Sequence, residues 1–314
     1  MRNYRGTLLA AIVALMPLSG TALAQAWLPP KGEAALSIGW SYNWAGHHLN
    51  YLGNIDSPGD MLFNIATTDL GYGLTDRLAV SVNLPYVVSK YRGPNPHPAR
   101  VGAPQYDTGA WNRTFQDFRS VVRFRVTTGS LAVTPMVALV VPTRGYEYIG
   151  HSAPGRRLVE GQIGVSVGRI LDPILPRGFA QARYLFAVPE KVIGISHNRS
   201  EVSLNMGYFV TDALTAQVFG AYAKTHGGWR APVDVPPPTS PNFQYHDQLR
   251  SAETFRLGGG VSYAVTGSID LGVSGFFTRW AKSDTNMSGV SLSVSYGFSP
   301  SQMIKRKKGS PPKP

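Results

Sequence analysis

The stretch GYGLTDRLAVSVNLPY, residues 71–86, reads as two β-strands joined by a tight turn. Every second residue from Leu78 to Leu84 is apolar, and the residues between them are small or polar. A period of two places these two sets on opposite faces of a pleated strand. The intervening Thr75-Asp76-Arg77 has the short polar side chains that favour turns. The stretch therefore predicts a hairpin with one apolar face and one small or polar face.

The same unit recurs along the chain, at residues 126–140, 210–222 and 265–277. Each copy alternates, passes through a Thr-Asp or Thr-Gly turn and alternates again. A chain built from one repeated hairpin is an all-β, antiparallel, up-and-down structure. We expect twelve strands, at about 33–44, 61–74, 77–89, 114–127, 131–143, 158–170, 178–189, 199–211, 213–225, 252–266, 268–280 and 288–298.

The predicted connections alternate between short and long. This alternation is typical of outer-membrane β-barrels, which have short periplasmic turns and longer extracellular loops, although a soluble sandwich is an alternative. Two long loops, 90–113 and 226–251, are rich in Pro, Gly and aromatic residues. We expect them either to fold inward and narrow the mouth or to bind ligand there, and the alternative is that they are disordered. The expected long loops are 45–60, 90–113, 144–157, 190–198, 226–251 and 281–287.

The two ends of the chain differ in character from its body. Residues 1–24 have two arginines, an apolar run and small residues before a cleavage point after Ala24, or after Ala26, and so predict a secretory signal peptide. Residues 299–314 form a basic, Pro-rich segment that we expect to be a disordered periplasmic tail, either inert or in contact with anionic headgroups. The barrel domain is then 25–298, located in the outer membrane.

Composition supports this location. The chain has no cysteine, and only 15% of its residues are charged, against about 25% in ordinary soluble proteins. Its net charge is +12, but seven of the basic residues lie in the two end segments, which contain no acid. The body carries the remaining +5, which gives no reason to invoke nucleic acid. We expect outer-membrane lipids to cover the apolar faces of the strands.

The hairpin at residues 71–86 resembles one typical of the putative outer-membrane transporter family named after the meta-pathway of phenol degradation. The strand VALVVPT, residues 137–143, is similar to a later strand of that family. The resemblance implies passage of small solutes, often aromatic or hydrophobic compounds. The last strand resembles the signal read by the barrel assembly machinery, through Tyr296 and Phe298, although sixteen residues follow it here.

Charged residues on the polar faces are expected to point into the lumen, because an Arg or Lys facing lipid near the midplane costs about 2–4 kcal/mol. Arginines there form a ladder that guides anionic solutes, such as aromatic carboxylates; the alternative is a salt-bridged network that fills and stiffens the barrel. Further inward candidates are Asp69, Gln162, Glu201 and Asp270. The proposed lumen selectivity residues are Asp117, Arg119, Arg123, Arg125, Glu160, Arg183 and Arg256.

No catalytic, metal or cofactor site is predicted. All seven histidines fall in predicted extracellular loops, where ordinary loop composition explains them, although loop ligands could converge on a metal. His151-Ser152, and His197 with Ser200, are close in sequence, but no nucleophile-elbow motif is present. The order of hypotheses is a solute channel or transporter, then a non-conducting structural or adhesive barrel, then an outer-membrane hydrolase, which a fixed His–Ser pair at the rim would favour. The histidines are His47, His48, His97, His151, His197, His226 and His246.

Overall fold

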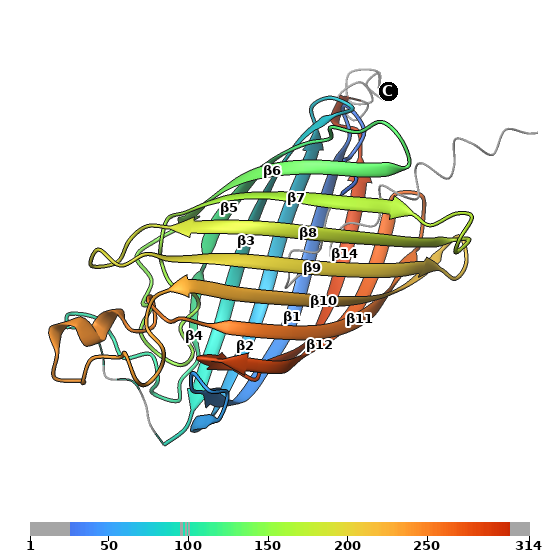
Figure 1. Ribbon diagram of the computed structural model, residues 1–314. Helices are drawn as coiled ribbons and strands as arrows, with labels where there is room; N and C mark the ends of the chain where they lie inside the picture. Colours follow the sequence, from blue (N-terminus) through green and yellow to red (C-terminus); the bar gives the residue numbers. More distant parts are fainter. Residues whose placement is uncertain (1–25, 95–96, 98, 100, 302–314) are drawn as a thin grey trace, which may run out of the picture.

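A computed structural model describes residues 26–94, 97, 99 and 101–301 (Figure 1). The predicted signal peptide up to Ala24, residues 302–314 of the predicted tail and part of the predicted loop 90–113 lie outside these described residues. No helix in the described part of the chain is long and apolar enough to cross a membrane. The long connections gather at one end of the barrel, including the orange segment that precedes β11 (Figure 1).

The strands match the predicted set closely. Twelve strands build the wall, because β4 and β5 follow one another along β3 as a single interrupted strand, and β13 is a two-residue addition to β1. The elements are β1 (Ala34–Leu49), β2 (Ile55–Gly73), β3 (Leu78–Arg92), β4 (Asn112–Phe115), β5 (Asp117–Phe124), β6 (Leu131–Pro142), β7 (Glu160–Ile170), β8 (Gly178–Pro189), β9 (His197–Phe209), β10 (Leu214–Gly227), the 3-10 helix η1 (Pro241–Tyr245), β11 (Glu253–Ala264), β12 (Ile269–Lys282), β13 (Asp284–Thr285) and β14 (Ser288–Phe298).

The sheet closes on itself through its first strand. β1 pairs antiparallel with β2 on one side and with β14 on the other, so Ala34 lies opposite both Tyr72 and Phe298. Every other wall strand pairs antiparallel with its neighbours in the chain. The predicted antiparallel up-and-down barrel is therefore confirmed. Closure pairs the first wall strand with the last, and of the described strands the short β4 is left with a partner on one side only.

Threonines close three of the short turns. The Oγ1 of Thr211 accepts hydrogen bonds from the backbone N–H groups of Ala213, at 3.2 Å, and Leu214, at 2.9 Å. Thr75 and Thr266 make the same pair of bonds in their own turns. Such side-chain acceptors satisfy backbone donors that a tight turn leaves without a strand partner.

The interruption between β4 and β5 has a local cause. Pro85 of β3 has no N–H to donate, so the regular ladder cannot continue past it. Gln116, the residue between β4 and β5, donates its N–H to the Pro85 carbonyl at 2.9 Å, and the register shifts across it. This irregularity lies beside the cavity described below.

The two faces of the wall are as predicted. Outward residues are apolar and exposed, for example Leu204 at 49% and Val294 at 48%. Their inward neighbours are small and polar, for example Ser203 and Ser295, each at 7%. An apolar outer band on a closed barrel is the surface that lipid covers.

One predicted loop is wrong. The expected loop 45–60 is a short turn around residues 50–54, because β1 and β2 extend well beyond their predicted ends. The paired strands contain register shifts between Ala45 and His47 and between His48 and Leu49, which break the alternation that marks a strand in sequence. His47 and His48, predicted in a loop, therefore lie in β1 near its end. Two more histidines predicted in loops also lie at strand ends: His197 begins β9, and His226 is near the end of β10.

Candidate functional site

A charged cavity of about 440 Å³ lies inside the barrel. β3, β5, β7 and β9 contribute lining side chains, and the connection between β6 and β7 folds against them. Its position on the inward face makes it the candidate site for a solute. Its polar lining residues are Asn83, Gln116, Asp117, Arg119, Arg156, Glu160, Gln162, Arg199 and Glu201.

Glu160 is the centre of the network that lines this cavity. Its side chain is only 8% exposed, and its two oxygens receive the Arg199 Nη2 at 3.1 Å and the Arg156 Nη2 at 3.5 Å. Gln162 also donates to it from Nε2 at 2.5 Å. A buried carboxylate with several donors of this kind is held in one position, because losing them would leave its charge without compensation.

Glu201 forms the second centre. It receives the Nε of Arg199 at 2.8 Å and lies 3.6 Å from the Nη2 of Arg183. Gln162 of β7 also connects the network to β5, because its Oε1 accepts a hydrogen bond from the Nε of Arg119 at 3.0 Å. The cavity wall therefore alternates carboxylates and guanidinium groups across β5, β7, β8 and β9.

The predicted lumen residues divide into two groups. Asp117, Arg119, Glu160 and Arg183 belong to the cavity or its network, and Asp117 accepts the Tyr146 hydroxyl at 2.5 Å. Arg123 lies on β5 and is buried, at 3% exposure, but it does not line the cavity. The structure does not bring the other two to the cavity: Arg125 follows β5 and donates to the Gly129 carbonyl at 3.2 Å, and Arg256 lies on β11 over the Phe276 ring.

Sequence reasoning missed two members of the network, Arg156 and Arg199. Arg199 shares a face with Glu201 by the period of two, and that signal was available. Arg156 comes from a loop, and only the path of the folded chain brings it to Glu160. Burial lowers the pKa of Arg156 to about 10, and it remains a cation at neutral pH.

Loops enter the barrel at its long-loop end. Tyr148 and Ile149 of the β6–β7 connection are buried. The backbone carbonyl of Ser152, in the same connection, accepts a hydrogen bond from the Ser89 hydroxyl at 2.6 Å. Gln248, from the β10–β11 connection, donates to the Arg156 carbonyl at 2.8 Å. The end of the β10–β11 connection therefore packs on the β6–β7 connection, and residues 155–158 of the β6–β7 connection line the cavity.

The first described residues enter the lumen at the short-turn end. Ala26 is 0% exposed and donates its N–H to Gln181 Oε1 at 3.2 Å. Its carbonyl accepts the Thr134 hydroxyl at 2.6 Å, and Trp27 packs edge-on against Phe179. The lumen is therefore narrowed from both ends.

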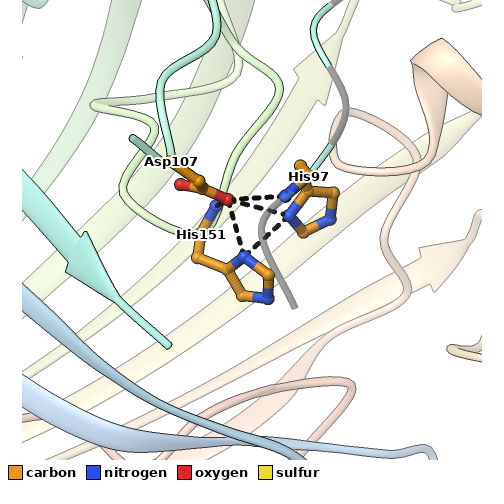
Figure 2. A group of neighbouring side chains, drawn as sticks. All are labelled: His97, Asp107 and His151. Atoms are coloured by element: carbon orange, nitrogen blue, oxygen red, sulfur yellow. Dashed lines mark hydrogen bonds and ion pairs between the residues drawn. The ribbon is translucent and has the colours of Figure 1, made fainter. Parts of the chain in front are cut away.

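Histidines and carboxylates meet among the loops. The Nδ1 atoms of His97 and His151 lie 3.2 and 2.7 Å from one oxygen of Asp107 (Figure 2), and His246 faces the other side of His97. Burial raises the pKa of Asp107, but hydrogen bonds from His151 and His97 outweigh it and hold this pKa well below its usual range. Burial also raises the pKa of Asp247, but the nearby His246, His97 and Arg250 side chains and the Gly150 backbone N–H outweigh it and lower this pKa. The sequence left open that histidines of several loops converge, but it did not specify which of them would meet.

A Ser–His pair is present at the rim, although not one of those predicted. The Oγ of Ser200 lies 2.8 Å from Nε2 of His226 and 3.1 Å from the hydroxyl of Tyr184, which is 44% exposed on the outer face. Among the described residues, no acid contacts the other ring nitrogen of His226 to orient it. A hydroxyl and an imidazole without such support lack the geometry of an activated nucleophile.

Comparison with known proteins supports the fold. No protein-family model and no curated protein matches the chain. Among solved structures, the COG4313 outer membrane channel from Pseudomonas putida F1 is similar, with a TM-score of 0.66, 12% identity, and coverage of 89% of this chain and 100% of that one. The β domain of the Bordetella autotransporter BrkA has a TM-score of 0.50 at 12% identity, covering 85% of this chain and 99% of that one. With its closed wall and apolar outer band, the chain is therefore a twelve-stranded outer-membrane β-barrel.

Proposed function

We propose that this barrel is a channel for the passive passage of small solutes across the outer membrane. The observation that carries the proposal is the charged cavity inside the wall, around Glu160 and Glu201. A twelve-stranded barrel is intermediate between small barrels filled by side chains and wide aqueous porins. A polar cavity in such a barrel is the natural place for a solute to pause and be selected.

We assign selectivity to the arginines of this cavity, with Arg119 first. Its Nε is engaged by Gln162, but its Nη2 is buried without a hydrogen-bond partner. A guanidinium presents donors in a planar fork that matches a carboxylate, so the preferred solutes are small anions. The resemblance to the phenol meta-pathway family, whose membership we propose for this chain, points to aromatic compounds, and the two arguments together favour aromatic carboxylates.

A non-conducting structural or adhesive barrel is the second candidate. It is favoured by one observation: the loops and the segment that starts at Ala26 occupy both ends of the lumen. In this alternative the Glu160 network serves only to fill and stiffen the wall. Assembly by recognition of Tyr296 and Phe298 is proposed in both cases; the Tyr296 ring is exposed and stacks on Phe298.

Single-channel conductance of the refolded mature chain in a planar bilayer tests the proposal. We expect discrete openings that added benzoate reduces, and we expect Arg119→Ala to weaken that block. Arg125→Ala is the matched control, because Arg125 lies on the same segment but donates to its own turn at Gly129. A correctly folded barrel that never conducts would refute the channel and support the structural barrel. Conductance with equal effects of the two substitutions would retain the channel but remove Arg119 from selectivity.

A further inference from the structure

Three loops bring nitrogen and oxygen donors together above the cavity. His97 and Asp107 come from the connection between β3 and β4, His151 from that between β6 and β7, and His246 and Asp247 from that between η1 and β11. The Asp107 side chain is fully buried and that of His151 is 7% exposed. Their convergence is not a consequence of sequence proximity, and it needs a physical reason.

The contacts within the triangle of Asp107 Oδ2, His97 Nδ1 and His151 Nδ1 are short on all three sides. The two nitrogens lie 3.2 and 2.7 Å from the oxygen and 2.8 Å from each other (Figure 2). The same oxygen also accepts the backbone N–H groups of His97 and His151, each at 3.0 Å, so it is an ionised acceptor. Each ring nitrogen is either an N–H donor or a lone-pair acceptor.

No assignment of ring protons satisfies all three sides of this triangle. If both nitrogens carry hydrogen, two N–H groups face each other at 2.8 Å. If one of them lacks hydrogen, its lone pair lies against the carboxylate oxygen at 2.7 or 3.2 Å. If both lack hydrogen, every contact is repulsive. A single cation bound by all three atoms removes each of these conflicts, because the lone pairs then point at one positive centre.

The surroundings already select the tautomer that such an ion requires. Nδ1 of His246 lies 2.6 Å from the Phe243 carbonyl, which only accepts, so this nitrogen carries the proton and Nε2 presents a lone pair. That lone pair is 2.8 Å from Nε2 of His97, which therefore carries hydrogen. In its neutral form, which is the form that binds a metal, the His97 ring then has its lone pair at Nδ1, directed at the triangle. A ring N–H held by a fixed acceptor is the usual outer support of a histidine that binds metal.

We propose that Asp107 Oδ2, His97 Nδ1 and His151 Nδ1 bind one divalent transition-metal ion of the zinc class. The circle through the three atoms has a radius of about 1.7 Å, smaller than the usual zinc–ligand distances of about 2.0–2.2 Å, so one ion reaches all three. Two imidazoles and one carboxylate favour zinc, nickel, cobalt or copper over magnesium or calcium, which prefer oxygen alone. The three-residue set leaves a coordination position for water.

The ion would tie the β3–β4 and β6–β7 connections together over the lumen. His151 is already stacked on Tyr91 of β3, with ring centroids 4.1 Å apart and planes at 9°. The bound loops are thus anchored to the wall as well as to each other. This departs from the sequence-based expectation of no metal, and it does not depend on whether the barrel conducts.

Metal uptake by the refolded barrel, without a polyhistidine tag and stripped with EDTA, tests the proposal. Calorimetric titration with Zn²⁺ is expected to show one equivalent bound. Asp107→Asn and His151→Gln should abolish this binding, and His246→Ala, which removes only the outer support, should weaken it about 10–100-fold. His226→Gln is the matched control, since His226 contacts Ser200 and not the triangle, and it should bind as the parent does.

A second measurement uses only the parent protein, so it tests the proposal even if a variant does not fold. X-ray absorption of the zinc-loaded parent should show nitrogen or oxygen ligands at about 2.0–2.2 Å with scattering from two imidazoles. The absence of saturable binding to the parent would overturn the proposal and leave a protonated His97 in the site. Undiminished binding by Asp107→Asn and His151→Gln variants that are folded would overturn it equally.

Discussion

The side chain of Thr211 stabilises the turn between β9 and β10. Its hydroxyl oxygen accepts from two backbone N–H groups, those of Ala213 and Leu214, at the link between β9 and β10. Thr75 and Thr266 repeat the arrangement at other short turns. The Thr-Asp and Thr-Gly pairs by which the hairpins were recognised in the sequence are therefore the residues that fix the turns.

Replacing the hydroxyl alone should measure this contribution. Thr211→Val keeps the branched shape but removes the acceptor, and we expect the free energy of unfolding to fall by about 0.5–1.5 kcal/mol. Urea unfolding of the refolded barrel in detergent is the measurement. Thr211→Ser retains the hydroxyl and should lose less; an equal loss in both variants would show that the hydrogen bonds do not matter.

Glu160 is a buried carboxylate in the lumen that forms ion pairs with two arginines. Glu160→Gln keeps its size but removes the charge that faces Arg156 and Arg199, both held within 3.5 Å. We expect a loss of about 1.5–3 kcal/mol in unfolding free energy, typical of hydrogen bonds to buried charged groups. Asp212→Asn breaks an exposed ion pair with Arg177 and should change stability little in the same assay. Similar losses for both would mean that the cavity is filled with water that screens the charges.

At the scale of strands, the sequence predicts nearly everything that the period of two controls. Ten of the twelve predicted wall strands begin and end within three residues of the observed ones. The exceptions are β1 and β2, whose long-loop ends extend five and six residues further because they pass through residues without alternation. The inward placement of Arg119 and Glu160 follows from the same period. Contacts made by loop residues do not follow from this period. Arg156 and His97 reach their partners through turns, and no local sequence pattern specifies the geometry of those turns.

Strand β7 also contains a glycine that makes room for the first described residues, Ala26 and Trp27. A side chain at Gly168 would meet the Ala26 Cβ at 2.5 Å and the Trp27 ring at 3.1 Å, whereas Gly161 on the same strand has open space around it. We expect Gly168→Leu to expel the segment from the lumen, and Gly161→Leu to leave it in place. The chain has no cysteine, so maleimide labelling of an Ala26→Cys background reports the change. Slow labelling in both variants would show that the segment shifts without leaving.

The whole molecule depends on lipid around its apolar band. Leu204, at the middle of β9, is 49% exposed on the outer face, and Val233, in the loop before η1, is 58% exposed. We expect Leu204→Arg to lower the unfolding free energy in lipid vesicles by about 2–4 kcal/mol, since the charge would face hydrocarbon. Val233→Arg should have little effect, because that position faces water. Equal effects would contradict the membrane-embedded placement of the band.

The segment that begins at Ala26 has a mechanical consequence. Around the wall β8 is the sixth strand from β1 in either direction, so it stands diametrically opposite. Ala26 is bonded to β6 and β8, and only a few residues later the chain enters β1. The segment between Ala26 and β1 therefore crosses the lumen and connects opposite sides of the wall. A deformation of the barrel that moves β8 away from β1 would stretch this segment, so the segment limits widening of the barrel along that diameter.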